Sequence, residues 1–586
     1  MNNQNPASSA ENLRHSLAHL LAAAVETHYP HARRTIGPAI ENGFYYDFDF
    51  TGGPVPGEAD LPKIEATMRD LMKSWKKFSR KEVSPAEAKE FFKGNPYKIE
   101  LINEFEREGG PITLYTSGNF TDLCRGGHAE DLSVIDPNSF KLARIAGAYW
   151  RGNEKNAMLT RIYGYAFPTK AELDAFLAML AEAEKRDHKK LGPELDLFTF
   201  SPLVGSGLPL WTPKGTLVRN LLDGYVWEMR KVRGYDQVEI PHITKKDLYQ
   251  TSGHWDKFKD DLFRITTREG HEFAMKPMNC PHHTQIYARR KWSYRELPQR
   301  YANTTMVYRD EQSGELAGLS RVRAITQDDA HVFCRMSQVK QEMLNIWDIV
   351  ETLYGTFGFS LRVRLSMRDP EHMEKYLGEP EKWDFAENML KEVAATKKTE
   401  TFAGLGEAAF YGPKLDFMAK DSIGREWQVA TIQMDMNMPE NFNLSCVNEK
   451  GENERIVMIH AAIMGSIERF LAVLIEHTAG AFPTWLSPEQ VWVLPVSDKF
   501  AEYGSQVLET LRAAGVRAEM PATDSTLGAR LREARRLKVP YMLVVGEKEA
   551  SSGTLSVNSR DRGQQKNPVT IQEFVAMINE EIRTRK

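Results

Sequence analysis

The chain has 586 residues, which corresponds to about four domains of ordinary size. Its composition, with 41% hydrophobic and 27% charged residues, excludes disordered, collagen-like and fibrous chains. The formal net charge of -4 excludes a uniformly basic nucleic-acid coat, but it leaves room for a local basic patch. The four cysteines are too widely spaced for a disulfide framework, so we expect a reduced, cytoplasmic protein.

The N-terminal part reads as a small α+β domain. The first residues are polar, without the apolar core of a signal peptide, and we predict a disordered tail over 1–10. Helical periodicity follows at 15–29 and 64–78, with an extended segment at 43–50. Segment 111–128 has the pattern strand, turn, strand and Gly-rich loop. No run approaches the roughly 18 apolar residues of a membrane helix, so no membrane association is expected.

A Lys- and Glu-rich helical linker is predicted over 170–192, and it ends at Gly192-Pro193. Beyond it, segment 215–234 has the pattern of a helix, and segment 236–243 that of a strand carrying Pro241. Further strand-like segments follow without regular crossover helices, which favours an antiparallel sheet over a doubly wound one. These segments are 304–310, 321–334, 408–418 and 426–436.

The last hundred residues, 486–586, alternate strands and helices, which predicts an α/β domain with a mostly parallel sheet. Segment 482–490 contains two prolines and is interpreted as the joint. The predicted fold class is therefore multidomain and mixed, α/β together with α+β parts.

Two segments carry charges that suit a nucleotide. Arg309, Arg321 and Arg323 are predicted on strands that flank a Gly-containing loop, where guanidinium groups could grip phosphates. Segment 457–477 has the pattern of a long apolar helix, and an Arg469 buried in it would need an anionic partner. The alternatives are a solvated charged hairpin for the first and an internal salt bridge for the second.

Longer strings identify a family. YRDE at 308–311, GSIERF at 465–470 and the strand proline Pro241 resemble the three motifs of class II aminoacyl-tRNA synthetases. MKPMNCPHH at 275–283 and FYGPKLDF at 410–417, together with TQDDAHVF, WQVATIQMD and VMIHAAIMGSIERF, resemble threonyl-tRNA synthetases. The resemblance runs from about residue 11 to the C-terminus, and the strings occur together and in order.

The resemblance implies three domains. These are an α+β editing domain at 11–169, an antiparallel-sheet catalytic core at 193–485, and an α/β anticodon-binding domain at 486–586, with the linker at 170–192. The small ubiquitin-like domain that commonly opens this family is not seen, and the chain is expected to begin almost directly at the editing module.

The resemblance also implies an activity. The enzyme would activate L-threonine with ATP and Mg²⁺ to threonyl-adenylate, and then transfer the threonyl group to the 3′ end of tRNA(Thr). Family members are homodimers joined near the Pro241 motif, so a homodimer is expected. The alternatives are a non-catalytic synthetase-like regulatory paralogue, a free-standing editing hydrolase, and a seryl or prolyl enzyme.

Carried over residue by residue, the resemblance assigns the synthetic site. Phosphate and adenine contacts fall on four catalytic residues, namely Arg309, Glu311, Arg321 and Arg469. Substrate contacts fall on a larger group, namely Met278, Gln327, Asp329, Tyr411, Lys414, Gln428, Thr431, Gln433 and Ser466.

A zinc ion is implied as well. Cys280, His331 and His460 are too far apart in sequence to be called ligands from spacing, and a lone cysteine is more often a packed small hydrophobe. The resemblance assigns all three to zinc, which would leave open positions for the amino and hydroxyl groups of threonine and so reject valine. His282 stands where the family usually has glycine, which adds a possible ligand or neighbouring group.

Serine lacks only one methyl group of threonine, a difference worth roughly 1–3 kcal/mol, so a second, hydrolytic site is expected. HSLAH at 15–19 and CRGGH at 124–128 each pair two side chains at a four-residue offset. Spacing alone leaves a second zinc site open. The resemblance instead implies metal-free hydrolysis of mischarged seryl-tRNA(Thr). The implied editing residues are His15, His19, Lys98, Asp122, Cys124 and His128.

Segment 526–538 carries a local charge of +4, which is either a solvated helix face or a tRNA contact. Within an anticodon-binding domain the second interpretation is favoured, because splayed anticodon bases are read by stacking and edge hydrogen bonds. The implied tRNA-binding residues are Arg530, Arg532, Arg536, Lys538 and Glu549.

Overall fold

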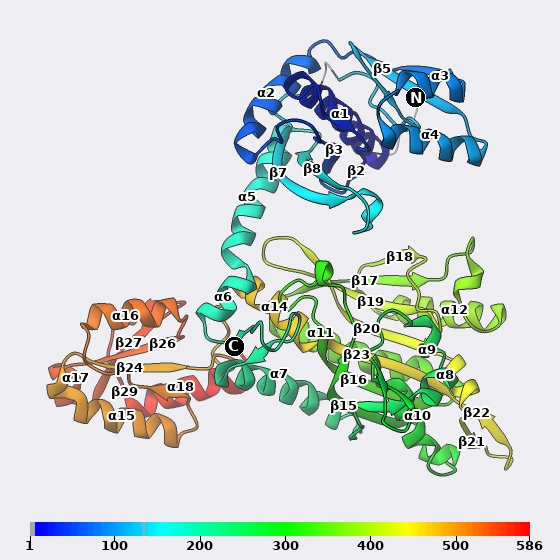
Figure 1. Ribbon diagram of the computed structural model, residues 1–586. Coiled ribbons are helices and arrows are strands. Elements are labelled where there is room, and N and C mark those ends of the chain that lie inside the picture. The colour runs from blue at the N-terminus through cyan, green and yellow to red at the C-terminus, as the bar shows by residue number, and fades with distance from the viewer. Residues whose placement is uncertain (1–5, 133–134) are drawn as a thin grey trace. The chain divides into compact units, whose positions relative to one another are not determined.

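The computed structural model describes residues 6–132 and 135–586 and divides into two compact units, Met1–Ala181 and Glu182–Lys586. Each unit is treated by itself (Figure 1). Throughout the described ranges, no helix combines the length and apolar character that crossing a membrane requires.

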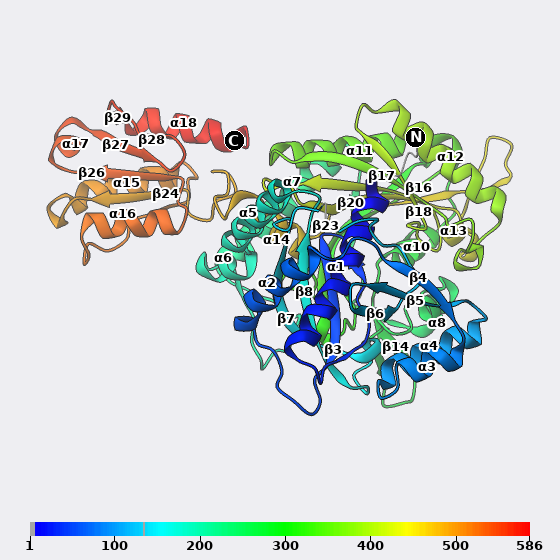
Figure 2. The ribbon, with the colours of Figure 1, turned by 90° about the horizontal axis from the view of Figure 1, so that it is seen from above.

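The first unit is built on an antiparallel sheet in the order β1-β3-β8-β7, with β2 paired to β3. Helix α1 (Pro6–His28) and helix α2 (Leu61–Met72) pack against one face of this sheet (Figure 2). The strands are β1 (Arg33–Arg34), β2 (Ala39–Ile40), β3 (Gly43–Asp49), β7 (Phe140–Tyr149) and β8 (Met158–Ala166). Because α1 begins at Pro6, the predicted tail is wrong for residues 6–10, and residues 1–5 lie outside the described part.

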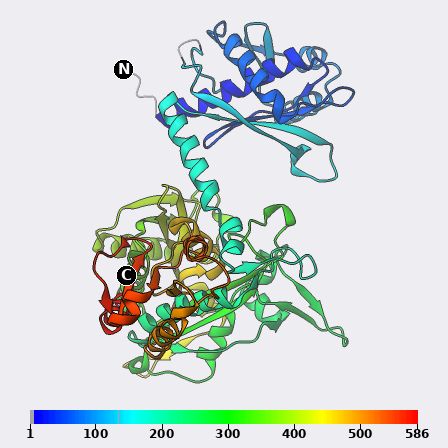
Figure 3. The same ribbon diagram turned by 90° about the vertical axis from the view of Figure 1, so that its left-hand side faces the viewer.

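A second sheet of three strands completes this unit, and the predicted strand–turn–strand at 111–128 is confirmed as its hairpin. It consists of β4 (Ser79–Val83), β5 (Ile112–Ser117) and β6 (Phe120–Leu123), and it packs against α3 (Pro85–Phe91) and α4 (Pro96–Glu108). Helix α5 (Lys170–Arg186) follows as one continuous rod (Figure 3).

The second unit contains an eight-stranded sheet in the order β11-β15-β16-β23-β20-β19-β17-β18. All neighbouring pairs are antiparallel except β11·β15 and β17·β18, so the predicted antiparallel sheet is confirmed. The strands are β11 (Asp236–Gln237), β15 (Gln299–Tyr308), β16 (Ala324–Cys334), β17 (Ser360–Met367), β18 (Thr401–Leu405), β19 (Lys414–Lys420), β20 (Glu426–Asp435) and β23 (Val457–Ser466).

One face of this sheet forms the main core. Four helices cover it, α7 (Pro213–Lys231), α11 (Val339–Thr356), α12 (Pro380–Thr396) and α14 (Ile467–Thr478). The strands alternate, so that Val332 and Ile459 enter this core while their neighbours point to the opposite face. That opposite face receives His331, His460 and the polar side chains of β20.

The apolar run at 457–477, predicted as one helix, is half strand. Residues 457–466 form β23 in the middle of the sheet, and α14 starts only after Gly465, at φ +72°, and the N-cap Ser466. A continuous apolar run suits a strand that is buried on both faces as well as it suits a helix, and periodicity alone does not separate the two.

Two other boundaries differ from expectation. Only Asp236–Gln237 of the predicted strand 236–243 joins the sheet, and Pro241 lies outside any strand because proline has no N–H to donate to a ladder. Helix α6 (His188–Glu194) runs through the predicted stop at Gly192-Pro193.

The C-terminal sheet, in the order β25-β24-β26-β27-β28 with β29 paired to β27, is mixed and not mostly parallel. The pairs β24·β25 and β24·β26 are parallel, while β27 returns antiparallel because only a short helix, α17, precedes it. Helices α15 and α18 pack on one face and α16 on the other (Figure 1). The strands are β24 (Val491–Pro495), β25 (Ala518–Glu519), β26 (Tyr541–Val545), β27 (Thr554–Ser559), β28 (Gly563–Gln564) and β29 (Val569–Thr570), and the helices are α15 (Ala501–Ala513), α16 (Leu527–Arg536), α17 (Glu547–Ser552) and α18 (Ile571–Arg583).

Short elements connect these parts. The helices are α8 (Lys246–Thr251), α9 (His254–Lys257), α10 (Cys280–Ala288) and α13 (Asn437–Asn441). The strands are β9 (Phe198–Thr199), β10 (Leu210–Trp211), β12 (Ile243–Lys245), β13 (Arg264–Thr266), β14 (Glu272–Met275), β21 (Ser445–Val447) and β22 (Asn453–Arg455).

Candidate synthetic, metal and editing sites

A cavity of about 500 Å³ opens beside the ends of β15, β16, β20 and β23 and the start of α14. Its lining includes eight residues predicted for the synthetic site, namely Arg309, Glu311, Arg321, Gln327, Gln428, Thr431, Ser466 and Arg469. Segments from four parts of the sequence therefore meet at one hollow, with three arginines in its wall.

The predicted arginine array lies in the connection between two strands and not on the strands themselves. Arg309 follows the last residue of β15, and Arg321 precedes β16. Burial lowers the pKa of Arg309, whose buried Nε has no partner among the described residues. Arg321 donates to the Glu311 carboxylate, 2.8 Å from Nε, so Glu311 is held by the loop itself.

Arg469 was predicted as a buried cation in an apolar helix, and that prediction is wrong. Its side chain is exposed to solvent on the first turn of α14 and reaches the cavity. The buried charge is the neighbouring Glu468, 1% exposed, which accepts the Thr326 N–H at 2.8 Å and lies 3.7 Å from the Arg219 guanidinium. Helix α14 is thus tied to β16 beneath the cavity.

Polar residues of β17 and β19 support the cavity floor. Lys414 was predicted from the sequence, but Asp416 and Arg364 were not. The buried Asp416 accepts from Thr431 Oγ1 at 3.0 Å and lies 3.1 Å from Lys414 Nζ. Arg364 reaches both Asp416, at 3.1 Å, and Gln428, at 2.9 Å. The available signal was period-2 alternation, because Lys414 and Asp416 point to the same face of β19.

Cys280, His331 and His460 come together, although 180 residues of sequence separate the first from the last. Their donor atoms lie within 4.8 Å of one another, and all three residues are buried. His331 and His460 are opposite each other in the β16·β23 ladder, with His331 Nε2 3.0 Å from His460 Nδ1. Cys280 reaches the same point from the start of α10.

The other nitrogen of each histidine has its own partner. His460 Nε2 lies 3.0 Å from Asp435 Oδ2, and His331 Nδ1 lies 2.7 Å from His283 Nδ1. Partners of this kind fix the ring orientation of metal-ligating histidines. One thiol and two imidazoles with oriented rings fit zinc, and they leave positions open. His282 is not part of the group, because its Nε2 contacts Thr244.

The remaining predicted substrate residues surround this group. The Tyr411 ring lies 5.1 Å from the His460 ring, tilted by 33°, and its hydroxyl donates to Gln433. Asp329 is buried beside His331, and its Oδ2 has no hydrogen-bond partner among the described residues. Burial raises the pKa of Asp329. Met278 Sδ lies 3.1 Å from the Arg309 guanidinium, which connects the metal group to the large cavity.

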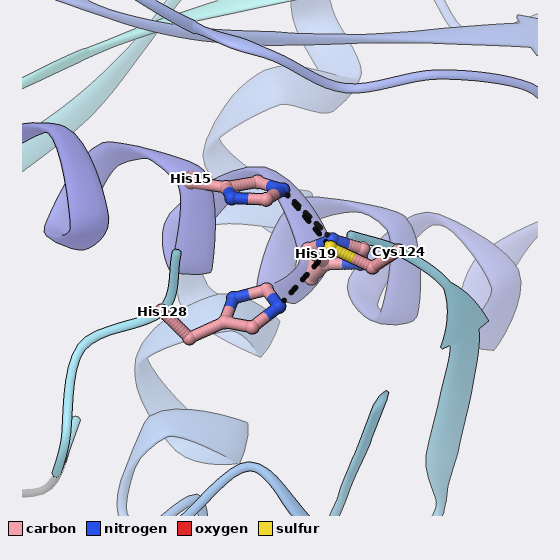
Figure 4. A group of neighbouring side chains, drawn as sticks. All are labelled: His15, His19, Cys124 and His128. Carbon is pink, nitrogen blue, oxygen red and sulfur yellow. Dashed lines mark hydrogen bonds between the residues drawn. The ribbon is translucent and has the colours of Figure 1, made fainter. Parts of the chain in front are cut away.

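In the first unit, His15 and His19 of α1 meet Cys124 and His128 of the loop after β6 (Figure 4). Cys124 Sγ lies 3.4 Å from His15 Nε2 and 3.3 Å from His128 Nε2, and the two α1 histidines are 3.3 Å apart. The period of the helix and the Gly-rich turn at 126–127 therefore bring four predicted editing residues to one point.

The carboxylate of Asp122 is the hub of the contacts that support this group, because it binds four neighbouring side chains. The carboxylate is fully buried and lies 2.7 Å from Lys98 Nζ and 3.2 Å from His19 Nδ1. Tyr46 donates to it at 2.6 Å and Arg34 at 3.2 Å, two contacts that sequence reasoning missed because neither residue lies in a motif. Burial opposes ionisation, but the charges of Lys98 and Arg34 hold the pKa of Asp122 well below its usual value.

His15, His128 and Cys124 of this group are uncharged at neutral pH. Burial lowers the pKa of His15 to about 4 and that of His128 to about 2, with repulsion from the neighbouring imidazoles added. Burial raises the pKa of the Cys124 thiol to about 11. The arrangement therefore offers neutral imidazoles and a protonated thiol, and the thiolate needed for nucleophilic attack is scarce.

The spacing of these four donors also matches a four-coordinate zinc site. Four protein ligands would close such a site and leave no position for water or substrate, which suits a structural metal and not a hydrolytic one. We therefore expect one zinc per chain, held by the Cys280 group. Metal analysis of the purified protein should show the zinc lost in Cys280→Ala and retained in Cys124→Ala. Two zinc ions per chain would mean that the group of His15, His19, Cys124 and His128 also holds zinc.

The residues predicted to bind tRNA, on and after α16, differ in how exposed and how free for a ligand their side chains are. Arg530 is 4% exposed and donates to the Pro495 carbonyl at 2.8 Å, so the tRNA contact predicted for it is wrong, because such a contact requires an exposed side chain. Arg536 is paired with Glu533, and Glu549 accepts the Gly546 N–H at 3.0 Å. Arg532 is exposed, and Lys538 follows the helix at φ +58°. Arg535 is a further exposed arginine on the same helix.

Three family descriptions match the chain. The tRNA synthetase class II core domain (G, H, P, S and T) matches residues 263–478, and the anticodon binding domain matches 490–581. The threonyl and alanyl tRNA synthetase second additional domain matches 112–163, which contains Asp122, Cys124 and His128.

Curated relatives extend the similarity to nearly the whole chain. A threonine–tRNA ligase of Flavobacterium johnsoniae is 48% identical over 97% of this chain and 88% of its own length. One of Gloeobacter violaceus is 48% identical over 98% of this chain and 92% of its own. Among solved structures, the RNA binding domain of threonyl-tRNA synthetase from Cryptosporidium parvum is 37% identical, with a TM-score of 0.64, over 67% of this chain and 98% of that one.

Proposed function

Because the chain belongs to the threonine–tRNA ligases, we propose that the 500 Å³ cavity is its ATP site and that the Cys280 group holds zinc for threonine. The chain is an aminoacyl-tRNA ligase of class II, with ATP, threonine and tRNA as its partners. The alternative of a non-catalytic paralogue gains no support, because the predicted phosphate arginines all line the cavity.

In the activation step, the threonine carboxylate attacks the α-phosphorus of ATP and pyrophosphate leaves. Arg309 holds the α-phosphate, while Arg321 and Arg469 bind the outer phosphates. Mg²⁺ bound with ATP would supply further positive charge to the phosphates. The observation that carries this assignment is that Arg309, whose buried Nε has no partner among the described residues, lines a cavity that has two further arginines in its wall. Fixed guanidinium groups stabilise the charge that develops during transfer without having to reorganise.

Cys280, His331 and His460 would hold zinc, which would supply a Lewis acid for the amino and hydroxyl groups of threonine. Asp329 accepts from the amino group through its unpartnered Oδ2, and Tyr411 closes the side-chain pocket over the His460 ring. The hydroxyl of threonine would then have zinc as its partner, whereas valine has a methyl group in that place and could not bind the metal. Such polar selection discriminates far better than a missing methyl group can.

For editing, we propose that water hydrolyses the ester of seryl-tRNA(Thr) at the group of His15, His19, Cys124 and His128. His15 is assigned the proton of the attacking water. Its Nδ1 donates to the Gly127 carbonyl at 3.1 Å, which leaves Nε2 as the proton acceptor, and its pKa of about 4 means that the ring is unprotonated at pH 7. His19 is held by Asp122, and Lys98 lies on the opposite side of that carboxylate. The thiol is not the nucleophile, since its pKa is raised.

We expect the double variant His15→Ala/His19→Ala to hydrolyse seryl-tRNA(Thr) about 100-fold or more slowly than the wild type, the usual size of a general-base contribution. Deacylation of preformed seryl-tRNA(Thr) measures it. His28→Ala, which removes a third histidine of α1 that contacts Thr67 instead, is the matched control and should not change the rate. Equal rates for wild type and double variant would refute editing through these histidines.

We propose the domain boundaries 11–169, 170–192, 193–485 and 486–586, with tRNA contacts at Arg532 and Lys538. A homodimer joined near the Pro241 segment is supported by its exposed apolar neighbours Val232 and Ile243, 81% and 52% exposed. The absence of any spanning helix in the described residues is compatible with the proposed site of action, the cytoplasm.

A further inference from the structure

A buried histidine of α6 connects two parts of the second unit that carry cavity residues. His188 is 4% exposed. Its Nδ1 lies 2.6 Å from Glu476 Oε1 on α14, and its Nε2 lies 3.0 Å from the backbone nitrogen of Leu319. Leu319 belongs to the connection between β15 and β16 that also carries Arg309 and Arg321.

The hydrogen bonds fix the protonation state of the ring. A backbone N–H can only donate, so His188 Nε2 is an unprotonated acceptor, and the ring proton is on Nδ1, from which it is donated to Glu476. Glu476 Oε2 is in turn 2.6 Å from the Arg425 guanidinium. Burial opposes ionisation of Glu476, but the hydrogen bond from His188 and the charge of Arg425 lower its pKa.

Arg425, Glu476, His188 and Leu319 form a relay of one ion pair, between the first two residues, and two hydrogen bonds. The donor atoms of Asp187, His188 and Glu476 lie close enough to suggest a metal site. However, the Nε2 lone pair and both Glu476 oxygens already have partners in the protein. A metal would have to displace a buried backbone N–H, which would lose its hydrogen bond, and an arginine, which would lose its ion pair.

The connection between β15 and β16 packs closely against His188. Leu319 is fully buried, and Gly318 has φ +55°, with a Cβ at that position clashing with His188 Nε2. The next two residues, Ser320 and Arg321, line the ATP cavity. A displacement of Leu319 would therefore move Arg321 away from the phosphates.

We propose that His188 is a positioning residue for threonine activation, which anchors Leu319 and so places Ser320 and Arg321 in the ATP cavity. The inference rests on the proposed role of Arg321 at the outer phosphates of ATP. It assigns a part in nucleotide binding to α6 and to the last turn of α14, although neither His188 nor Glu476 reaches the cavity.

The test is threonine-dependent ATP–pyrophosphate exchange by His188→Phe, which keeps a ring and removes both hydrogen bonds. We expect KM for ATP to rise about tenfold, because ground-state binding is lost, with a smaller change in kcat and in KM for threonine. Hydrolysis of seryl-tRNA(Thr), which uses the other unit, should stay unchanged. A KM for ATP equal to that of the wild type would overturn the proposal.

His477→Phe is the matched control. That neighbouring histidine also makes two bonds, accepting from the Ser422 N–H at 3.0 Å and donating to the Phe357 carbonyl at 3.0 Å, but it does not touch the connection. An equal rise in KM for ATP in both variants would mean a general packing effect and refute the relay. If His188→Phe does not fold, Glu476→Gln decides, with an expected rise of about threefold or no rise if the relay is wrong.

Arg321→Gln, measured in parallel, separates this inference from the role on which it rests. If Arg321→Gln leaves KM for ATP unchanged, then the proposed role of Arg321 is wrong. If KM rises in Arg321→Gln and not in His188→Phe, the role of Arg321 stands and the positioning role of His188 falls.

Discussion

Replacement of Arg309 by glutamine is expected to lower kcat/KM of threonine-dependent ATP–pyrophosphate exchange about 1,000-fold, or about 4 kcal/mol of transition-state stabilisation. The reason is that a fixed guanidinium binds a phosphate by charge-assisted hydrogen bonds, which glutamine cannot replace. In this protein the Arg309 Nε is buried and has no partner among the described residues, so the side chain is available to a ligand.

Arg335→Gln is the control for this prediction. Arg335 comes directly after β16, but its guanidinium is paired with Glu449 and Glu454 at 2.6 Å and 2.7 Å, so its loss should leave the exchange rate nearly unchanged. Hydrolysis of seryl-tRNA(Thr) by Arg309→Gln should also be unchanged and would show that the chain has folded. An exchange rate within tenfold of the wild type would refute the phosphate role of Arg309.

Replacement of Cys280 by alanine is expected to remove the bound zinc and to lower kcat/KM for threonine about 1,000-fold. It should also reduce the preference for threonine over valine from about 10⁴ to about 10² or less, because a pocket without a partner for the hydroxyl cannot strongly separate two side chains of nearly equal shape. Pyrophosphate exchange with each amino acid measures both quantities, and the zinc content is measured on the same samples.

Cys334→Ala is the matched control. Cys334 lies three residues after His331 on the same strand, but it points into the core on the opposite face of the sheet. It should therefore cost stability through lost packing while zinc content and amino-acid preference stay unchanged. A preference for threonine that survives in zinc-free Cys280→Ala would mean that the protein, without the metal, reads the hydroxyl.

The spacing of apolar residues predicted a helix or strand correctly wherever a single period, helical or strand-like, ran through the segment. The amphipathic helices α2 and α18 and the β5·β6 hairpin could be predicted from apolar spacing and turn residues. It failed at β23, because a central strand covered on both faces has no alternation to show. It also failed in the C-terminal sheet, where β27 reverses direction after a helix as short as α17.

The site residues also divide into those that local spacing could pair and those that only the fold brings together. His15 and His19 could be paired from helical spacing, and Cys124 and His128 from their shared loop, but the hub at Asp122 with Tyr46 depends on strands far apart in sequence. Arg469 and Arg530 were misjudged for a related reason. The sequence shows which charges a helix carries, but the packing around it decides which of them is buried.

The sequence by itself determined the chemistry of this protein: arginines for phosphate, a cysteine and histidines for a metal, and family strings long enough to identify a threonine–tRNA ligase. Only the tertiary structure decided how these groups meet. Pairing of β16 with β23 sets His331 3.0 Å from His460 across 129 residues of chain, and the docking of α6 sets His188 against Leu319 across 131. Such contacts follow from strand register and helix packing, which depend on the whole core and leave no local trace in the chain.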